Sequence, residues 1–317
     1  MLNIGQERPS PIEIDTNGEL RAVAIAPNGE YLVSGGTSES GVRLWRMQDG
    51  QPIASLGMQY VRSLAVSRDG RWIAAGTWKE VVVWDATTHE RVFVQGERTA
   101  AYFDGVDFSP DSTQLVTGSF NKTASIWDIA ANHRVVGPLL HKDVVVAAKY
   151  APDGTRIATA TPSGSVRVYD SNDGRLLFDI PVKVSPWFNT GLLWSNRRLF
   201  VVSDVTIKQV DAYTGSEISE WPVPDSNSAS CCIALPQHGE YIAYATYQSV
   251  TVWDTSTHSQ LGLIQHPQNI HSMVLSPDDR FLVIAGENGK ITINSLARVN
   301  ASTIPYGVFG QAIYAFS

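Results

Sequence analysis

Cysteine is nearly absent from this 317-residue chain, and its two cysteines are neighbours, Cys231 and Cys232. Because adjacent cysteines almost never pair with each other, the sequence excludes an internal disulfide framework. Runs of Lys or Arg are also missing, and the formal net charge is −7, from 24 basic and 31 acidic residues. This balance argues against a phosphate-binding surface as the main functional feature, and therefore against nucleic acid as a partner.

Long apolar segments are missing too. No stretch of the sequence reaches the length needed to cross a bilayer, and no charged region followed by an apolar one opens the chain. Hydrophobic residues make up 43% of the chain and charged residues 17%, which is typical of a globular protein that buries a core. We therefore expect a soluble intracellular protein without a membrane partner, located in the cytoplasm or, as an alternative, in the nucleus.

The chain also lacks a helical pattern, since no segment keeps a period of 3.6 residues over ten positions. Instead, a short apolar strand followed by a turn recurs every 40 to 44 residues, with the strand ending at Ala26, Ser67, Ser109, Ala151, Ser195, Leu235 and Ser276. A second series follows these turns at Trp45, Trp84, Trp127, Tyr169, Val210, Trp253 and Asn294. Three members of the second series form a Trp-Asp dipeptide, at positions 84, 127 and 253. A period of this length predicts a repeat architecture.

Within one unit, the pattern predicts strands only. Residues 103–140 divide into four apolar segments, 103–109, 114–119, 124–129 and 134–140, separated by turns rich in Pro, Asp, Asn and Lys. A four-stranded antiparallel sheet cannot bury both of its faces alone, so each sheet needs a neighbour on either side. Radial stacking around an axis satisfies this need and leaves only short edges exposed.

These repeats resemble those of the WD40-repeat β-propeller family over roughly residues 10–299, through the three Trp-Asp dipeptides and the Ser-Pro-Asp-like turns that precede them. The resemblance implies an all-β fold, a seven-bladed propeller of four-stranded antiparallel sheets. It also implies that the first strand of each unit lines the central channel and that the strand after Trp-Asp lies outermost. We expect residues 1–317 to form a single domain of this kind.

The seam of the ring has two candidate closing strands. Residues 11–15, "PIEID", alternate in polarity and would supply the outer strand of the last blade, which is the closure we favour. Residues 302–306, "STIPY", compete for the same place, although Pro305 would deny the ladder one donor. The final segment 311–317, "QAIYAFS", reads like the opening of another unit. Residues 300–317 are thus either an extra segment at the seam or the cut end of a longer repeat array.

The repeats depart from the family pattern in their expected polar network. The Gly-His of the family survives only as His141 and His266, and the Asp of the second turn is replaced by Asn121, Ser163 and Asn288. The His–Ser/Thr–Asp–Trp network that the resemblance implies is therefore incomplete in every blade. Because His141 lacks its Asp partner, we expect His141→Ala to cost about 1 kcal/mol or less.

Motifs for catalysis or metal binding are not found. The sequence has no Gly-x-Ser-x-Gly, His-Glu-x-x-His, phosphate-binding glycine loop or clustered Cys and His. His89, His133 and His258 recur after their Trp residues but fall in separate blades, so solvated turns explain them better than a shared ion. We expect no enzyme activity, cofactor or metal. The alternative is a metal-assisted hydrolase or lactonase-like propeller with a site in the channel, for which Asp104 is the one acidic residue at a channel-facing start position.

Aromatic residues recur where the resemblance implies a loop-lined channel mouth. The turns after the second strands contain Trp78, Phe120, Pro162 and Tyr247, and the loops between units contain Tyr60, Tyr102 and Trp187. Arg21, Arg62, Asp104 and His271 stand near the starts of the inner strands. Aromatic side chains beside Arg are typical of binding hot spots. The sequence therefore predicts a non-catalytic scaffold that binds a protein or peptide partner across this mouth.

Overall fold

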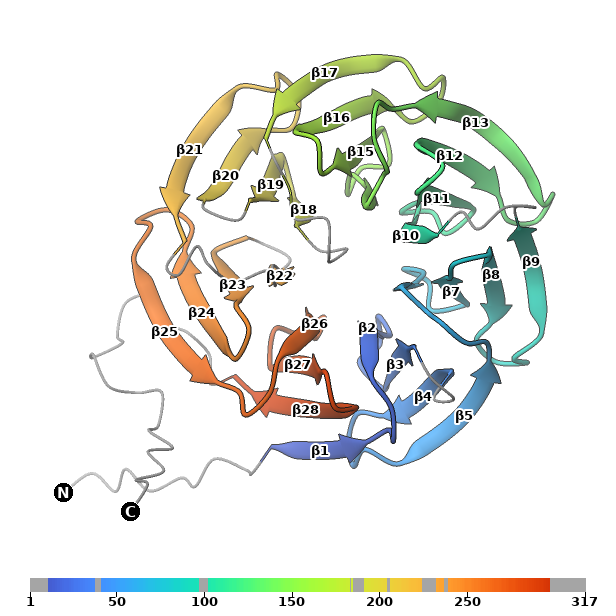
Figure 1. The fold of residues 1–317 in the computed structure, drawn as a ribbon, viewed down its shortest axis with the longest axis vertical. Coiled ribbons are helices and arrows are strands. Elements are labelled where there is room, and N and C mark those ends of the chain that lie inside the picture. The colour runs from blue at the N-terminus through green and yellow to red at the C-terminus, as the bar shows by residue number, and fades with distance from the viewer. Residues whose placement is uncertain are drawn as a thin grey trace.

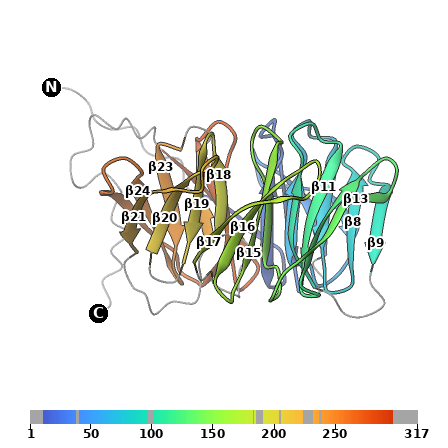
Figure 2. The same ribbon diagram turned by 90° about the horizontal axis from the view of Figure 1, so that it is seen from above.

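The computed structural model describes residues 11–37, 41–96, 102–182, 184, 191–203, 206–223, 232–236 and 239–296. These residues form seven four-stranded sheets, and all strand pairs within the sheets are antiparallel. The sheets stand around a central axis like the blades of a propeller (Figure 1). Seen from the side, they form one ring with turns at both of its faces (Figure 2). The predicted all-β, seven-bladed fold is confirmed.

Each blade runs from an inner strand at the channel to an outer strand at the rim. Blade 1 contains β2 (Leu20–Ile25), β3 (Tyr31–Gly36), β4 (Val42–Arg46) and β5 (Pro52–Gly57). Blade 2 contains β6 (Ser63–Val66), β7 (Trp72–Gly76), β8 (Glu80–Asp85) and β9 (Arg91–Gly96). Blade 3 contains β10 (Phe103–Phe108), β11 (Gln114–Ser119), β12 (Thr123–Asp128) and β13 (His133–Leu140). Blade 4 contains β14 (Ala147–Tyr150), β15 (Arg156–Thr161), β16 (Ser165–Asp170) and β17 (Leu176–Pro181).

The remaining blades complete the circle. Blade 5 contains β18 (Leu192–Ser195), β19 (Arg198–Val202), β20 (Thr206–Asp211) and β21 (Glu217–Pro222). Blade 6 contains β22 (Cys232–Ala234), β23 (Tyr241–Ala245), β24 (Ser249–Asp254) and β25 (Gln260–Gln265). Blade 7 contains β26 (Ile270–Leu275), β27 (Phe281–Gly286), β28 (Lys290–Ser295) and, as its outer strand, β1 (Ile12–Asp15). In the described part of the chain, no helix is both long and apolar enough to cross a membrane.

The core lies between neighbouring blades, which explains the sequence pattern of the strands. Four consecutive residues of β8, from Val81 to Trp84, are buried because both faces of this strand are covered by adjacent sheets. The outer strand β9 instead alternates, with Phe93 buried between exposed Val92 and Val94. Trp84 packs in one apolar cluster with side chains of blades 1 and 2, so the two sheets share a core. Central strands therefore read as continuous apolar runs, and outer strands as alternating ones.

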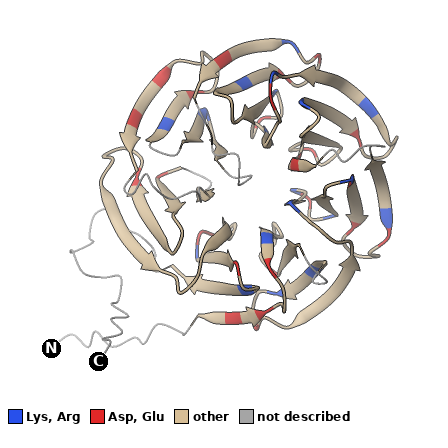
Figure 3. Ribbon diagram, in the orientation of Figure 1, with Lys and Arg blue, Asp and Glu red and all other residues tan. Residues whose placement is uncertain are grey.

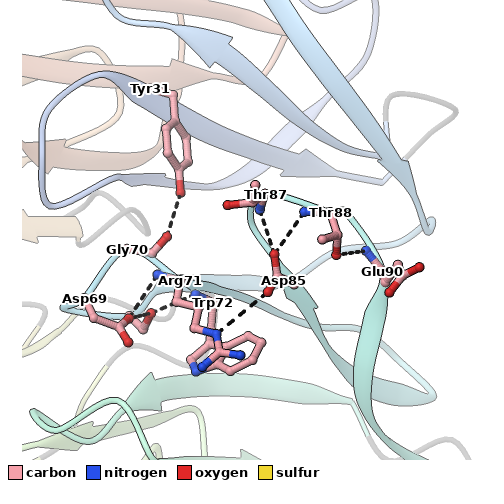
Figure 4. Close-up of polar contacts among 10 residues, drawn as sticks. Tyr31, Asp69, Gly70, Arg71, Trp72, Asp85, Thr87, Thr88 and Glu90 are labelled. Atoms are coloured by element: carbon pink, nitrogen blue, oxygen red, sulfur yellow. Dashed lines mark hydrogen bonds and ion pairs between the residues drawn. The ribbon is translucent and has the colours of Figure 1, made fainter.

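The Asp of the Trp-Asp dipeptide has a local structural function. Asp85 follows Trp84 at the end of β8, and its Oδ1 accepts hydrogen bonds of 2.9 Å from the backbone amides of Thr87 and Thr88 (Figure 4). These bonds from Thr88 and Thr87 hold the pKa of Asp85 below its usual value. Asp254 caps its turn in blade 6 in the same way, through the amides of Ser256 and Thr257. The dipeptide therefore combines a buried ring with a capped turn.

The seam of the ring is closed by the N-terminal segment. Strand β1 pairs antiparallel with β28, and Ile12 and Ile14 lie opposite Ile293 and Ile291. The amide and the hydroxyl of Thr16 both donate to the carbonyl of Gly289, at 2.9 and 2.8 Å. The competing segment 302–306, the terminal segment 311–317 and the rest of 297–317 lie outside the described residues.

The expected cost of about 1 kcal/mol or less for His141→Ala rested on the missing Asp partner. Nε2 of His141 instead lies 2.8 Å from Thr159 Oγ1 and 3.2 Å from the Tyr169 hydroxyl. Its Nδ1 lies 2.9 Å from the carbonyl of Leu139. A buried imidazole with three partners costs more to remove than one without. The sequence argument considered only the family's usual partner, so the structure revises the expected cost upward.

Candidate functional site

The two faces of the ring differ in the connections that they carry. One face, called the mouth face here, carries the turns between the second and third strands of each blade and the loops that link successive blades. The opposite face carries the remaining turns within the blades. Trp78, Phe120 and Tyr247 lie in mouth-face turns of blades 2, 3 and 6, and Tyr60 and Tyr102 lie in the linking loops that lead into blades 2 and 3.

Blades 2 and 3 bring two aromatic pairs to the mouth face. The rings of Tyr60 and Trp78 meet edge to face, with centroids 6.1 Å apart. The rings of Tyr102 and Phe120 are tilted, with centroids 5.0 Å apart. Both tyrosines remain accessible, with 50% of Tyr60 and 37% of Tyr102 exposed. Each pair therefore consists of a half-buried ring that supports an exposed tyrosine.

The loop before blade 2 holds Tyr60 in an unusual backbone conformation. Gly57, Met58 and Tyr60 all have positive φ angles, of 70°, 70° and 58°. A bulky side chain rarely occupies this region, and holding it there costs on the order of 1–3 kcal/mol. The amide of Val61 donates to Gly36 at 2.9 Å, which fixes the chain directly after the strained residue. The backbone is therefore locally strained at the residue that presents the most exposed ring of this region.

An ion pair lies beside the aromatic pair of blade 3. Arg62 Nη2 lies 3.0 Å from Asp104 Oδ2, and Arg62 Nε also donates to Asp104 Oδ1, so the pairing is bidentate. The guanidinium carbon lies 5.4 Å from the ring centroid of Tyr102 and 5.7 Å from that of Phe120. Asp104 is 4% exposed. Burial raises the pKa of Asp104 above its usual value, although Arg62 counteracts the rise.

A close approach between blades 2 and 3 allows Arg62 and Asp104 to pair. Gly76 ends β7, and a Cβ on it would lie 2.4 Å from the carbonyl oxygen of Phe103. The carbonyl of Gly76 accepts a hydrogen bond of 2.8 Å from the amide of Arg62. Only glycine allows the start of β10 to come this near, which places Asp104 beside the inner end of blade 2.

Removing the carboxylate should destabilise this region. We expect Asp104→Asn to lower the free energy of unfolding by about 2 kcal/mol, because the half-buried Arg62 would lose a charged partner. Chemical denaturation at pH 7 measures the effect. Asp49→Asn is the matched control, since Asp49 forms an exposed pair with Arg46 at 2.9 Å, and exposed pairs contribute about 1 kcal/mol or less. Equal losses in the two variants would contradict a structural role for the Arg62–Asp104 pair.

The candidates of the first and last blades serve as internal contacts. Arg21 Nη2 lies 2.6 Å from Glu19 Oε1, and its Nε is buried without a hydrogen-bond partner among the described residues. His271 is 8% exposed, and its Nδ1 lies 2.9 Å from the carbonyl of Leu20. That contact joins blade 7 to blade 1. His271 is thus placed to connect blades, while Arg21 lies at the edge of the channel mouth.

Two aromatic candidates are not joined to these pairs. Tyr247 is 42% exposed but belongs to blade 6, on the other side of the ring. Trp187 lies outside the described residues. The sequence argument also overlooked Lys79, whose Nζ lies 4.2 Å from the ring centroid of Trp78. Lys79 directly follows Trp78 in the turn between β7 and β8, and this adjacency in the sequence could have indicated the contact. We call Tyr60, Arg62, Trp78, Tyr102, Asp104 and Phe120 the mouth cluster.

Other features of the ring offer less chemistry. Within the described ranges, no group of three or more His, Cys, Asp or Glu side chains could hold a metal ion. His258, one of the recurring turn histidines, stacks on Trp221 with centroids 4.4 Å apart. A cleft of about 530 Å³ lies on the opposite face between blades 5 and 6, lined by Arg197, Arg198, Tyr241, Thr255 and Leu261 among others. The residues predicted to form a site lie on the other face from this cleft.

Comparison with known proteins identifies the repeats. A family model described as "WD domain, G-beta repeat" matches residues 13–46, 50–85, 99–128, 137–170 and 258–293, more than half of the chain. The chain belongs to the WD40 family. The resemblance inferred from the Trp-Asp dipeptides is thereby confirmed. The unmatched interval includes blade 5, where Val210 replaces the WD40 tryptophan.

Several WD40 proteins resemble this chain over part of their length. A guanine nucleotide-binding protein subunit beta of Zea mays is 29% identical over 50% of this chain and 46% of its own length. A serine-threonine kinase receptor-associated protein of Gallus gallus is 21% identical over 86% of this chain and 65% of its own length. A U3 small nucleolar RNA-associated protein 15 homolog of Xenopus laevis is 21% identical over 90% of this chain and 55% of its own length. The alignments thus span less than two thirds of each of these relatives.

A solved structure extends the likeness of fold. A chain in the crystal structure of the mitotic checkpoint complex superposes with a TM-score of 0.78, covering 93% of this chain and 97% of that one. The sequence identity is 18%, so the match concerns the propeller fold alone. Relatives named as a subunit or as proteins associated with a receptor or an RNA are, by those names, parts of larger assemblies.

Proposed function

We propose that this WD40 propeller is a non-catalytic interaction scaffold that binds a protein or peptide partner through the mouth cluster. The observation that carries the proposal is the pair of exposed tyrosines, Tyr60 and Tyr102, each backed by a half-buried ring, with the Arg62–Asp104 pair beside Tyr102. Tyrosines held in this way offer a large contact area at a small cost in side-chain entropy. Rigid aromatic anchors beside Arg are the usual centre of a binding hot spot.

The residues of the cluster have different functions in this proposal. Tyr60 and Tyr102 contact the partner, and Trp78 and Phe120 fix their rings. Asp104 is too buried to contact a partner and acts by orienting Arg62. Arg21 contributes at the edge of the mouth, His271 by holding blade 7 against blade 1, and Tyr247 and Trp187 as outlying contacts for a partner that spans the mouth.

Three findings support the proposal. Tyr60 keeps a costly backbone conformation, and strain of this kind concentrates at functional positions. The aromatic cluster lies in loops supported by a rigid ring of sheets, where binding residues are most often found. Several relatives carry the names of components of larger assemblies, including a nucleolar RNA-associated protein, so we propose a protein partner in the cytoplasm or the nucleus.

The test is affinity capture followed by mass spectrometry with the wild-type chain and a Tyr60→Ala/Tyr102→Ala variant. We expect the variant to recover the specific partner at least tenfold less well, with a melting temperature close to that of the wild type. Tyr213→Ala is the matched control, because Tyr213 is 40% exposed in a turn of the opposite face. Equal recovery by all three proteins would overturn the mouth cluster as the binding site.

A second variant separates binding from folding. Tyr60→Gly removes the ring while accepting the positive φ without strain, so we expect its stability to equal or exceed that of the wild type. Loss of the partner by this stable variant would assign the effect to the missing ring. Retention of the partner by both Tyr60→Gly and the double variant would count against the proposal.

A further inference from the structure

We infer that the partner segment held by the mouth cluster is acidic and carries a large apolar side chain. This inference rests on the proposed function and adds the chemical class of the partner. It follows from which charges at the mouth are already paired and which aromatic faces are already covered.

Three of the four rings of the cluster each have one of the protein's own cations near one face. Lys79 Nζ lies 4.2 Å from the ring centroid of Trp78. The Arg62 guanidinium lies within 5.7 Å of the centroids of Tyr102 and Phe120. A ligand with an ammonium or guanidinium group would have to displace these side chains and approach them against their charge. The cluster therefore disfavours a Lys-rich, Arg-rich or quaternary ammonium ligand.

Two acidic side chains of the described mouth-face residues are paired with arginines. Asp104 is bound by Arg62, and Glu19 accepts both the Arg21 guanidinium at 2.6 Å and the Thr37 hydroxyl at 3.1 Å. Asp143, in the loop after blade 3, accepts only the amide of Val144 at 2.8 Å, and Glu80 begins β8 with its side chain partly buried. Among the described residues, Arg62 and Arg21 therefore neutralise Asp104 and Glu19 before a cationic partner could pair with them.

Three lysines next to the cluster provide the opposite charge. Lys79, Lys122 and Lys142 are exposed on mouth-face connections of blades 2 and 3, and none has an ion-pair partner in the part of the chain that the structure describes. Lys122 Nζ donates to the carbonyl of Lys142 at 3.3 Å, which holds these two connections together. Lys79 follows Trp78 in its turn, and Lys122 lies two residues after Phe120, so we call these three lysines, in chain order, the lysine row. Such a row is suited to carboxylates.

Acidic side chains also lie far from the mouth cluster. Figure 3 shows red segments on the outer strands β17 and β21, which contain Asp179, Glu217 and Glu220. These carboxylates lie on the rim of blades 4 and 5, away from blades 2 and 3. Because salt screens charges beyond about 8–10 Å at physiological ionic strength, the local lysines decide the approach of a partner to the mouth. An overall charge of −7 is therefore compatible with an acid-selective site.

The exposed tyrosines account for the apolar part of the ligand. Tyr60 and Tyr102 leave ring surface open above the supporting residues, and a large apolar side chain would cover it. Carboxylates on the same segment would then meet the lysine row. The combination resembles a hot spot with an apolar centre and a charged rim.

The probes are three fluorescent decapeptides measured by anisotropy with the complete chain. The first contains Glu and Asp around a central Phe, the second has Ser in place of Phe, and the third has Lys in place of each acidic residue. We expect only the first to bind, with an affinity that falls as salt is raised. Equal affinity for the second or third peptide, or failure of the first to bind, would overturn the inference.

Charge-reversal variants test the lysine row directly. Lys79→Glu/Lys122→Glu should weaken binding of the first peptide at least tenfold. Arg68→Glu/Arg175→Glu makes the same change in net charge at exposed positions of the opposite face and should leave binding within twofold. Equal effects of the two double variants would show that net charge alone acts, which contradicts the inference.

The two proposals fail in different ways. If Tyr60→Ala/Tyr102→Ala loses the captured protein partner while Lys79→Glu/Lys122→Glu retains it, the mouth cluster remains the binding site and the acidic class is wrong. If both double variants still capture the partner, the proposed binding site itself is wrong.

Discussion

Deleting residues 1–16 is expected to lower the melting temperature by roughly 5–10 °C, because this segment supplies the outer strand of blade 7. Ile14 is 4% exposed and packs in a cluster that includes Trp45 and Met47 of the neighbouring blade 1. Its loss would expose apolar surface of two blades and leave the edge of β28 unpaired. Burial of one such side chain is worth about 1.5–3 kcal/mol, before the lost ladder is considered.

Point substitutions in the same strand separate packing from strand length. Ile14→Ala should destabilise the protein by about 2–4 kcal/mol, since it leaves a cavity between blades 7 and 1. Glu13→Ala is the matched control, because Glu13 is exposed and forms only a distant pair with Lys290 at 3.7 Å, and such a pair contributes about 1 kcal/mol or less. Thermal melts followed by circular dichroism measure both variants and the deletion.

An unchanged melt after the deletion would contradict β1 as the stabilising closure. The competing segment 302–306 would then have to provide the outer strand. The sequence offers two candidates for the outer strand of blade 7, residues 11–15 and 302–306. The melting temperature of the deletion variant shows whether the N-terminal candidate stabilises the ring.

His141→Ala is expected to lower the free energy of unfolding by roughly 2–3 kcal/mol at pH 7, because Thr159 and Tyr169 would lose a buried partner. The stabilisation should depend on pH. Burial lowers the pKa of His141 from 6.5 to about 4, so the folded protein holds this side chain neutral while the unfolded chain protonates it.

Because the pKa of His141 is lower in the folded state, its contribution to stability decreases as the pH falls. Above pH 6.5 both states carry a neutral His141, and its contribution to stability is complete. As the pH falls from 6.5 toward 4, the unfolded state gains a proton that the folded state resists, and the contribution is lost. At about 1.4 kcal/mol per pH unit, roughly 2.5 kcal/mol disappears by pH 4.5. The gap between wild type and variant should therefore nearly close at pH 4.5.

Urea unfolding at pH 7 and at pH 4.5 measures the difference in free energy of unfolding between the wild type and His141→Ala at each pH. His133→Ala is the control for removal of a histidine, since His133 is exposed at the start of β13 and its loss should change the free energy of unfolding little at pH 7. The pKa of the buried His266 is also lowered by burial, which adds acid sensitivity to wild type and variants alike. A gap for His141→Ala that stays constant with pH would mean that this imidazole does not stay neutral in the fold.

In the proposed function, the mouth cluster occupies two sectors of the ring whose loops differ from the rest. Blades 2 and 3 contain the Trp-Asp dipeptide and the turns that the fold needs, while their mouth-face connections differ from those of other blades in carrying Tyr and Lys together with a second aromatic residue, Trp78 or Phe120. The strands fix the positions of these loops, and the loop residues decide the partner. One frame can therefore present a different surface at each sector of the ring.

Parts of the site were readable from the sequence, and parts were not. Aromatic residues in the second turns of the repeats predicted Trp78 and Phe120 at the mouth, and the repeat phase placed Arg62 and Asp104 at inner strands. Their pairing could not be read, because nothing in the local pattern says which way two side chains 42 residues apart will turn. The partners of His141 were missed for the same reason, since Thr159 and Tyr169 belong to strands whose register only the folded sheet defines.

The strands, their grouping into units and the number of units follow from the chain alone, because alternation, turn residues and a repeat of about 42 positions are local properties. The folded ring adds that the N-terminal strand occupies the outer edge of blade 7, that Asp104 pairs with Arg62, and which aromatic residues meet. These contacts depend on ring closure. Side-by-side packing of the blades brings side chains of neighbouring repeats into contact. Which of them pair depends on their charges, volumes and rotamers, and the sequence of a single repeat does not contain this information.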